Sequence, residues 1–140
     1  MNDQTGDTFM ATERDRRGAF VSQFKDRTRA FALRVIRLVD ALSQSRSADV
    51  LDKQLLRSAT SVGANYRAAC RARSKAEFLA KLGIVEEECD ESMYWLELII
   101  SAELLRSTQV EPLLAEANEI LSVCIKSIQT ARARKQSPTP

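Results

Sequence analysis

The sequence contains no histidine. This absence excludes Ser-His-Asp and Cys-His nucleophile pairs, metal sites with imidazole ligands, and pH switching by an imidazole. Only four glycines and three prolines occur in 140 residues, and residues 1–111 contain no proline. β-Sandwiches, barrels and doubly wound α/β folds need many tight turns, which are built from these two residue types. An all-β fold is therefore strongly disfavoured, and a doubly wound α/β fold is disfavoured as well.

The chain has three cysteines, Cys70, Cys89 and Cys124, which lie far apart and form no CxxC pair. Neither a zinc site nor a disulfide framework is indicated, so we expect small buried side chains in a reducing compartment. Residues 1–20 are polar and charged, without the apolar core of a signal peptide. No run of about 18 uncharged apolar residues is present either. We expect a cytoplasmic protein that does not interact with membranes.

Apolar residues recur at alternating steps of three and four, the spacing of helices that pack in a bundle. The pattern predicts helices from Gly18 or Phe24 to Ser45, over 49–72, over 74–106, and from about residue 110 onward with Pro112 in the first turn. Short connections between helices of similar length predict an all-α, antiparallel up-down-up-down four-helix bundle over residues 18–135. Residues 1–17 and 136–140 are predicted to be disordered. The apolar stripes of the first two helices are Phe24, Thr28, Phe31, Val35, Leu38 and Leu42, and Leu55, Ala59, Val62, Tyr66 and Ala69.

Several residues are candidates for helix caps or for contacts between helices. Ser47 or Asp49 is a candidate N-cap of the second helix, and Ser74 with Glu77 fits a capping box at the start of the third. The many small residues around Gly63 make the second helix thin, which permits a close approach by a neighbouring helix.

The third helix is apolar nearly all round in its C-terminal half, so we expect it to meet another subunit there. The candidate interface residues are Met93, Tyr94, Trp95, Leu98, Ile100 and Leu104.

Charge is unevenly distributed along the chain. Residues 1–81 contain 16 Lys and Arg against nine Asp and Glu, whereas residues 82–140 contain five against ten. The acidic cluster over residues 86–91 is read as a solvated or salt-bridged face, with Arg57, Arg67 or Lys81 of a neighbouring chain as possible partners. A carboxylate metal site needs acids from several helices facing one another, so we expect neither a metal nor any other cofactor. No nucleophile-and-base arrangement and no phosphate-binding glycine loop is present, so we expect no enzymatic activity.

A stretch in the middle of the chain resembles a known family. The pieces LLRSATSVGANY, the turn from Arg71 to Phe78, and the acidic stretch ending in YWLEL are similar to the bacterial four-helix-bundle family whose members include proteins encoded in intervening sequences of 23S ribosomal RNA genes. The resemblance implies a homopentameric, barrel-like ring. A related branch, the accessory subunits of diversity-generating retroelements, binds nucleic acid and a reverse transcriptase through a basic surface. One departure is YRAACRA, where many members have an Ala-Glu-Gly step after the second-helix Asn.

A basic cluster lies at the end of the second helix and the start of the third. Cations there are favoured by the helix dipole alone, but they also suit contacts with phosphates. With the resemblance, the candidate nucleic-acid-binding residues are Arg57, Arg67, Arg71, Arg73 and Lys75. We therefore expect a non-enzymatic oligomeric scaffold that binds RNA, DNA or a nucleoprotein through this basic surface. The alternative is a protein–protein adaptor with no nucleic-acid role, in which charge reversal at Arg71 and Arg73 leaves partner capture intact.

Overall fold

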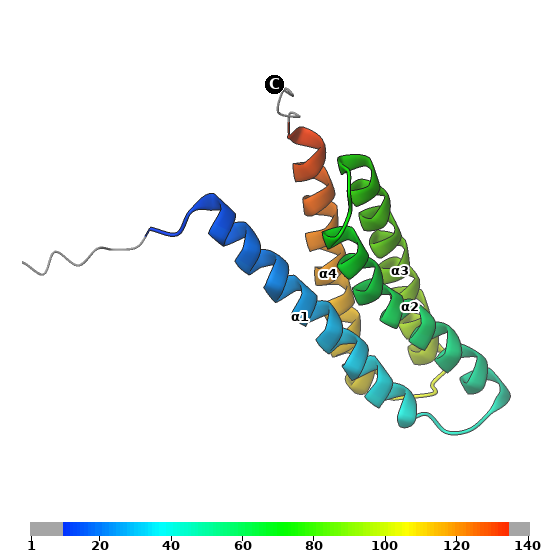
Figure 1. Ribbon diagram of the computed structural model, residues 1–140. Helices are drawn as coiled ribbons and strands as arrows, with labels where there is room; N and C mark the ends of the chain where they lie inside the picture. Colours follow the sequence, from blue (N-terminus) through cyan, green and yellow to red (C-terminus); the bar gives the residue numbers. More distant parts are fainter. Residues whose placement is uncertain (1–9, 135–140) are drawn as a thin grey trace, which may run out of the picture.

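Four helices make up the computed structural model, which describes residues 10–134: α1 (Glu13–Asp40), α2 (Arg46–Cys70), α3 (Lys75–Ser101) and α4 (Ser107–Ala133). In cyclic order, α2 packs against α1 and α3, and α4 packs against α3 and α1 (Figure 1). This arrangement confirms the predicted all-α up-down-up-down bundle. Of the residues predicted to be disordered, 1–9 and 136–140 lie outside the described residues, whereas 13–17 belong to α1. No helix of the described part is long and apolar enough to cross a membrane.

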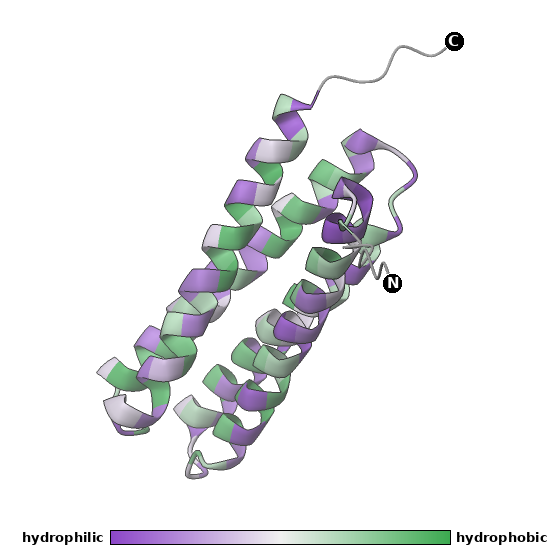
Figure 2. Ribbon diagram, turned by 90° about the vertical axis from the view of Figure 1, so that its left-hand side faces the viewer, coloured by the Kyte–Doolittle hydropathy of each residue, from purple (hydrophilic) through white to green (hydrophobic). Residues whose placement is uncertain are grey.

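The core consists of one stripe from each helix, and hydrophobic segments of the ribbons face one another across the bundle (Figure 2). The predicted stripe of α2 is buried in full, and that of α1 is buried from Phe24 to Leu38. In α3 the small Ser92 fills the position between Cys89 and Leu96. In α4, Leu114 and Leu121 are only half-buried. The buried positions of α4 are Val110, Leu113, Ala117, Ile120, Cys124 and Ile128.

Helix α1 begins five residues before the predicted Gly18. Thr12 and Asp15 form a reciprocal capping box, in which Thr12 Oγ1 accepts from the Asp15 amide at 3.1 Å and Asp15 Oδ2 accepts from the Thr12 amide at 3.0 Å. These bonds satisfy amides that have no partner in the first turn. They also lower the pKa of the Asp15 carboxyl, because they favour its charged form.

The connection between α1 and α2 is also placed differently from the prediction. Ser45, not Ser47 or Asp49, caps α2, and its side chain accepts from the Ala48 amide at 3.1 Å. A cap residue needs an extended backbone, so α1 cannot continue to the predicted Ser45. The helix ends at Asp40. Ser74 caps α3 as predicted, but the Glu77 carboxylate accepts from the Arg73 amide rather than from that of Ser74. The predicted capping box is therefore only half formed.

Helix α3 ends at Ser101 and not at the predicted Arg106. The amide of Leu104 bonds to the Ile99 carbonyl at 3.1 Å, and that of Glu103 bonds to the Ile100 carbonyl at 3.0 Å. This Schellman ending places Glu103 at φ 57° and turns Leu104 back against the core.

Helix α4 begins at Ser107, earlier than predicted. At its start, the Gln109 side chain accepts a hydrogen bond from the Arg106 amide at 3.3 Å. Pro112 is therefore the sixth helical residue and lies beyond the first turn. Its missing N–H leaves the carbonyl of Thr108 without a helical partner, at an exposed site where water can supply one.

The N-terminal part of α1 leans away from α4, while the other three helices stay together (Figure 1). Every residue from Glu13 to Phe20 is exposed, and the first buried residue of α1 is Phe24. Further along, α1 is joined to α4 by Arg27, whose Nε lies 3.0 Å from Glu116 Oε1 and whose guanidinium also pairs with Glu119. The lean leaves one end of the bundle partly open.

Candidate nucleic-acid interface

Positive charge gathers at one end of the bundle. The end of α2, the start of α3 and the end of α4 lie together at the upper end in Figure 1, and the start of α1 lies at the same end, off to the left. Within residues 10–17, 66–77 and 126–134 there are ten Lys and Arg against three Asp and Glu. We call these cations the basic end: Arg14, Arg16, Arg17, Arg67, Arg71, Arg73, Lys75, Lys126, Arg132 and Arg134.

Contacts between helices hold the basic end together. Lys75 Nζ donates to the backbone carbonyl of Arg134 at 2.8 Å, which joins α3 to α4. The Arg134 guanidinium lies 3.8 Å from Glu13 Oε1, and Arg17 lies 3.4 Å from the same oxygen, so α1 is joined to α4. Glu13 is thus shared between two cations, and its single negative charge leaves the region strongly positive. These ion pairs are exposed, and pairs of this kind contribute about 0–1 kcal/mol each, so they define the arrangement more than the stability.

The sequence-predicted residues Arg67, Arg71 and Arg73 are all exposed and belong to the basic end. None of the three has an ion-pair partner among residues 10–134. They lie in and just after the last turn of α2, where the helix dipole favours cations. Their guanidinium groups are therefore available to phosphates in solution.

Arg57 is separated from this group. It lies ten residues before Arg67 on the same helix, about 15 Å along the axis. Its guanidinium lies 3.3 Å from Glu88 and also pairs with Glu91, both on α3 of the same chain. The hydrogen bond to Glu91 raises the pKa of Arg57, and the same bond lowers the pKa of the Glu91 carboxyl. Arg57 is therefore neutralised and joins α2 to α3.

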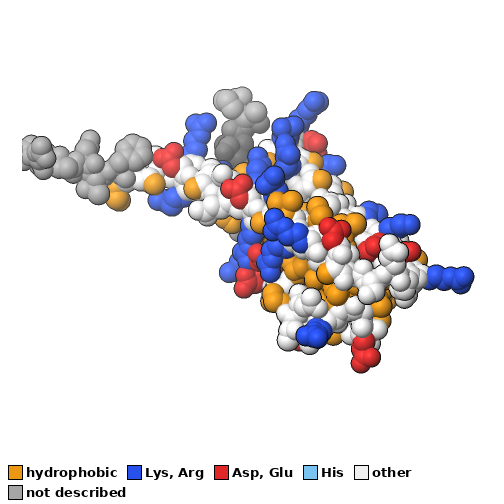
Figure 3. Space-filling model, turned by 90° about the horizontal axis from the view of Figure 1, so that it is seen from below, with side chains coloured by type: hydrophobic (Ala, Val, Ile, Leu, Met, Phe, Trp, Pro, Cys, Tyr) orange, Lys and Arg blue, Asp and Glu red, His pale blue; other side chains and the backbone are white. Residues whose placement is uncertain are grey.

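The opposite end of the bundle lacks this excess of positive charge. Within residues 38–50 and 97–111 there are five Asp and Glu against two Arg. Figure 3 shows the molecule from this side, with acidic and basic side chains scattered among hydrophobic ones. The charge asymmetry therefore follows the long axis of the bundle, and an anionic partner is attracted to the basic end.

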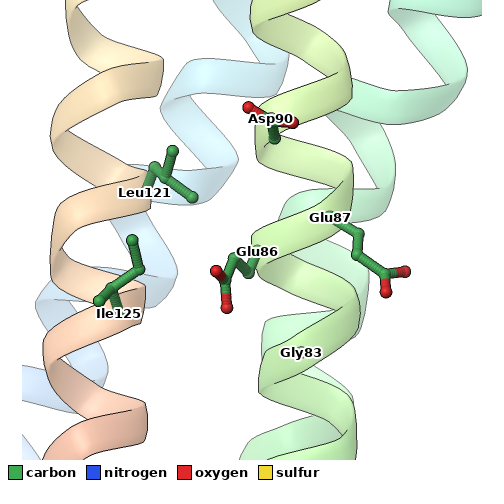
Figure 4. Close-up of a pocket in the computed structure, with 6 residues that line it drawn as sticks. All are labelled: Gly83, Glu86, Glu87, Asp90, Leu121 and Ile125. Carbon is green, nitrogen blue, oxygen red and sulfur yellow. The ribbon is translucent and has the colours of Figure 1, made fainter.

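The acidic cluster of α3 is divided into two parts. Glu88 and Glu91 pair with Arg57 of the same chain, so the predicted pairing with a neighbouring chain is not needed for them. Glu86 and Asp90 border a hollow of about 480 Å³ between α3 and α4. Leu121 and Ile125 of α4 lie on the other side of this hollow (Figure 4). Among the described residues, no three acids or cysteines are grouped so that they could share a metal ion.

The predicted oligomer-interface residues are better covered by their own chain than the sequence suggests. Met93, Trp95, Ile100 and Leu104 pack partly buried against the core, and Leu98 is half-buried. Trp95 Nε1 also donates to Glu91 at 3.3 Å. Only Tyr94 of the six is exposed, at 53%. Neighbouring helices cover α3 because it packs against both α2 and α4.

Sequence reasoning found the middle of the basic end and missed both of its flanks. The missed cations come from the start of α1 and the end of α4, at least 50 residues from the Arg67–Lys75 cluster on either side. A usable signal was present, because the first and third helices start, and the second and fourth end, at the same side of an up-down bundle. Counting charge by helix end instead of by sequence half would have placed these cations together.

Comparisons with known proteins agree with this fold. Residues 22–126 match the family described as 23S rRNA-intervening sequence protein. A crystal structure of a protein with unknown function from the S23 ribosomal protein family of Bacteroides thetaiotaomicron is 40% identical to this chain, with a TM-score of 0.71. The match covers 76% of this chain and 98% of that one. No curated protein matches. The chain therefore belongs to the 23S rRNA-intervening sequence protein family.

Proposed function

We propose that this protein is a non-enzymatic oligomeric scaffold that binds the phosphate backbone of nucleic acid through its basic end. The observation that carries the proposal is the gathering of ten cations and three carboxylates from all four helices at one end. Backbone contacts of this kind supply affinity without reading sequence. The family name refers to intervening sequences of 23S rRNA, and the related Bacteroides thetaiotaomicron protein is described as from the S23 ribosomal protein family, so RNA is the first ligand to test.

The scaffold part of the proposal is a homopentameric ring, as the family resemblance implies. A ring repeats the basic end in each subunit, and simultaneous contacts raise the overall affinity for one long polyanion. Light scattering tests the ring, with an expected mass of five times 15.7 kDa. A single-chain mass at every protein concentration would remove the ring from the proposal.

The nucleic-acid part is tested by fluorescence anisotropy with a labelled single-stranded RNA and the equivalent DNA, over a series of salt concentrations. The logarithm of the binding constant should fall linearly with the logarithm of salt, with a slope of about −0.7 per phosphate contacted. Replacing Arg67, Arg71 and Arg73 together by Ala should make that slope shallower by about 2. These side chains are exposed and have no ion-pair partner in the described chain, so the fold should persist.

Arg57→Ala is the matched control, because Arg57 is an exposed arginine of the same helix that lies away from the basic end. It should leave the slope unchanged. Binding that is absent, or that does not respond to salt, would refute the nucleic-acid role. An equal loss in the Arg57 variant and the triple variant would instead show that the basic end is not the contact surface.

A further inference from the structure

A groove opens where the N-terminal part of α1 leaves α4. It has a volume of about 690 Å³. Its walls come from Phe20 and Val21 of α1 and from Val123 and Ala131 of α4, and its floor includes Cys70 of α2 and Phe78 of α3. We call it the α1–α4 groove. It is formed by all four helices and lies beside the exposed arginines of α2 without including them.

The lip of the groove carries an exposed aromatic side chain. Phe20 is 43% exposed, although its ring stacks on that of Phe24, with the centroids 5.9 Å apart. Phe24 in turn meets Tyr66 edge-on at 4.6 Å, so the aromatic row continues into the core. Phe20 therefore presents an apolar surface that is held in place from below and still contacts water. A surface of this kind is available to a partner with an apolar face.

The charged residues of the lining are all cationic. Arg17, Lys75, Lys126 and Arg134 border the groove, and no Asp or Glu is among its lining residues. These cations come from α1, α3 and the C-terminal end of α4, so they lie on both sides of the apolar floor. A partner that fits has apolar groups in the middle and negative charges at its margins.

The dimensions favour a helix over an extended lipid chain. The lining positions of α4 and its C-cap run from Val123 to Arg134, about 16 Å or three helical turns. The N-terminal part of α1, which carries Phe20 and Val21, leans away from α4 on this side (Figure 1). A fatty acyl chain there would keep much of its apolar surface in water, whereas an amphipathic helix turns its polar face outward. We propose that the α1–α4 groove binds an amphipathic helix of a partner protein, with an apolar stripe flanked by Asp and Glu.

The test uses a fluorescein-labelled peptide of about four helical turns, with Leu at positions i, i+3, i+4 and i+7 and Glu on both flanks of the stripe. Two control peptides are matched to it: one has Lys in place of every Glu, and one has the same composition in an order that destroys the stripe. Anisotropy with the full-length protein should show saturable binding of the acidic peptide. Both controls should bind at least about tenfold more weakly, because one reverses the charge complementarity and the other removes the apolar face.

Protein variants locate the site. Phe20→Ala and Lys126→Glu should each weaken binding of the acidic peptide by about tenfold, and both residues are exposed enough for the fold to be retained, which circular dichroism verifies. Arg71→Ala is the matched control, since Arg71 is exposed at the same end but does not line the groove. Phe20→Ala should leave RNA binding unchanged, so failure of this inference and failure of the proposed function can be told apart.

A second readout comes from Cys70, which lines the groove, while the other two thiols are fully buried. Saturating acidic peptide should slow labelling of Cys70 by a maleimide in the folded protein. Equal binding of the Glu and Lys peptides, or unchanged affinity in Phe20→Ala, would overturn the proposal. Displacement of the peptide by sodium palmitate at submicellar concentration would assign the groove to a lipid. A fall in oligomer mass in Phe20→Ala would assign it to a second copy of the chain.

Discussion

The close approach of α1 and α2 can be measured with two glycine substitutions that differ in one respect. Gly63 and Gly83 are both half-buried residues in helix interiors. A Cβ added at Gly63 would lie 3.3 Å from Thr28 Oγ1 and 3.6 Å from the Thr28 backbone carbon. A Cβ added at Gly83 would meet nothing within 4 Å. The pair therefore separates helix propensity from helix packing.

The expected magnitudes follow from two terms. Replacing Gly by Ala in a helix interior stabilises the folded state by about 1 kcal/mol, and this applies at both sites. At Gly63 the new methyl group must push Thr28 away, and overpacking of a buried contact costs about 1–3 kcal/mol. Gly83→Ala should therefore raise the free energy of unfolding by about 1 kcal/mol. Gly63→Ala should leave it unchanged or lower it by up to about 2 kcal/mol.

Urea unfolding followed by circular dichroism measures both, at one protein concentration because association would shift the midpoint. With a urea dependence of about 2 kcal/mol per molar, Gly83→Ala should move the midpoint up by about 0.5 M. Removing the obstacle provides a control: in a Thr28→Ala background, Gly63→Ala should recover a gain close to that of Gly83→Ala. If Gly63→Ala alone stabilises as much as Gly83→Ala, the close contact between α1 and α2 does not exist in solution.

Three further predictions concern single residues. Glu103→Gly should stabilise the protein by about 1 kcal/mol, because the φ of 57° suits glycine and a carboxylate opposes the helix dipole; an unchanged or lower melting temperature would contradict this. In Arg57→Met the pKa of Glu91, measured by NMR titration, should rise toward that of a free Glu. Because Arg57 lowers the pKa of Glu91, the Arg57–Glu91 pair contributes its full stability above the pKa of a free Glu. That contribution disappears as the pH falls through the lowered pKa of Glu91. The free energies of unfolding of wild type and variant should therefore converge in acid. Cys89 and Cys124, whose pKa burial raises to about 12, should resist iodoacetamide at pH 8 until urea unfolds the chain; native labelling of either would show that the core opens locally.

The family resemblance and the helical periodicity predicted the fold, because both are properties of local sequence. The stripe of α2 from Leu55 to Ala69 is buried as predicted, since every third or fourth residue of a helix points to one side whatever its partners are. Helix ends were harder to place. Ser45 caps α2 in place of Ser47, and α3 ends at Ser101 in place of Arg106, because neighbouring residues compete as helix ends. At the end of α3, the observed turn also packs Leu104 against the core.

The sequence predicted only part of the grouping of charged residues in the folded chain. The sequence identified Arg67, Arg71 and Arg73, which are neighbours along the chain. It did not join them to the cations at the start of α1 and the end of α4, because that proximity exists only after four helices have folded back on one another. It also grouped Arg57 with them, whereas side chains from α3 neutralise Arg57 in the folded chain. Periodicity by itself determined most of what lies inside the bundle, because it fixes which side of each helix is apolar. The tertiary structure decided which charges are paired, which are left together, and where α1 opens the groove.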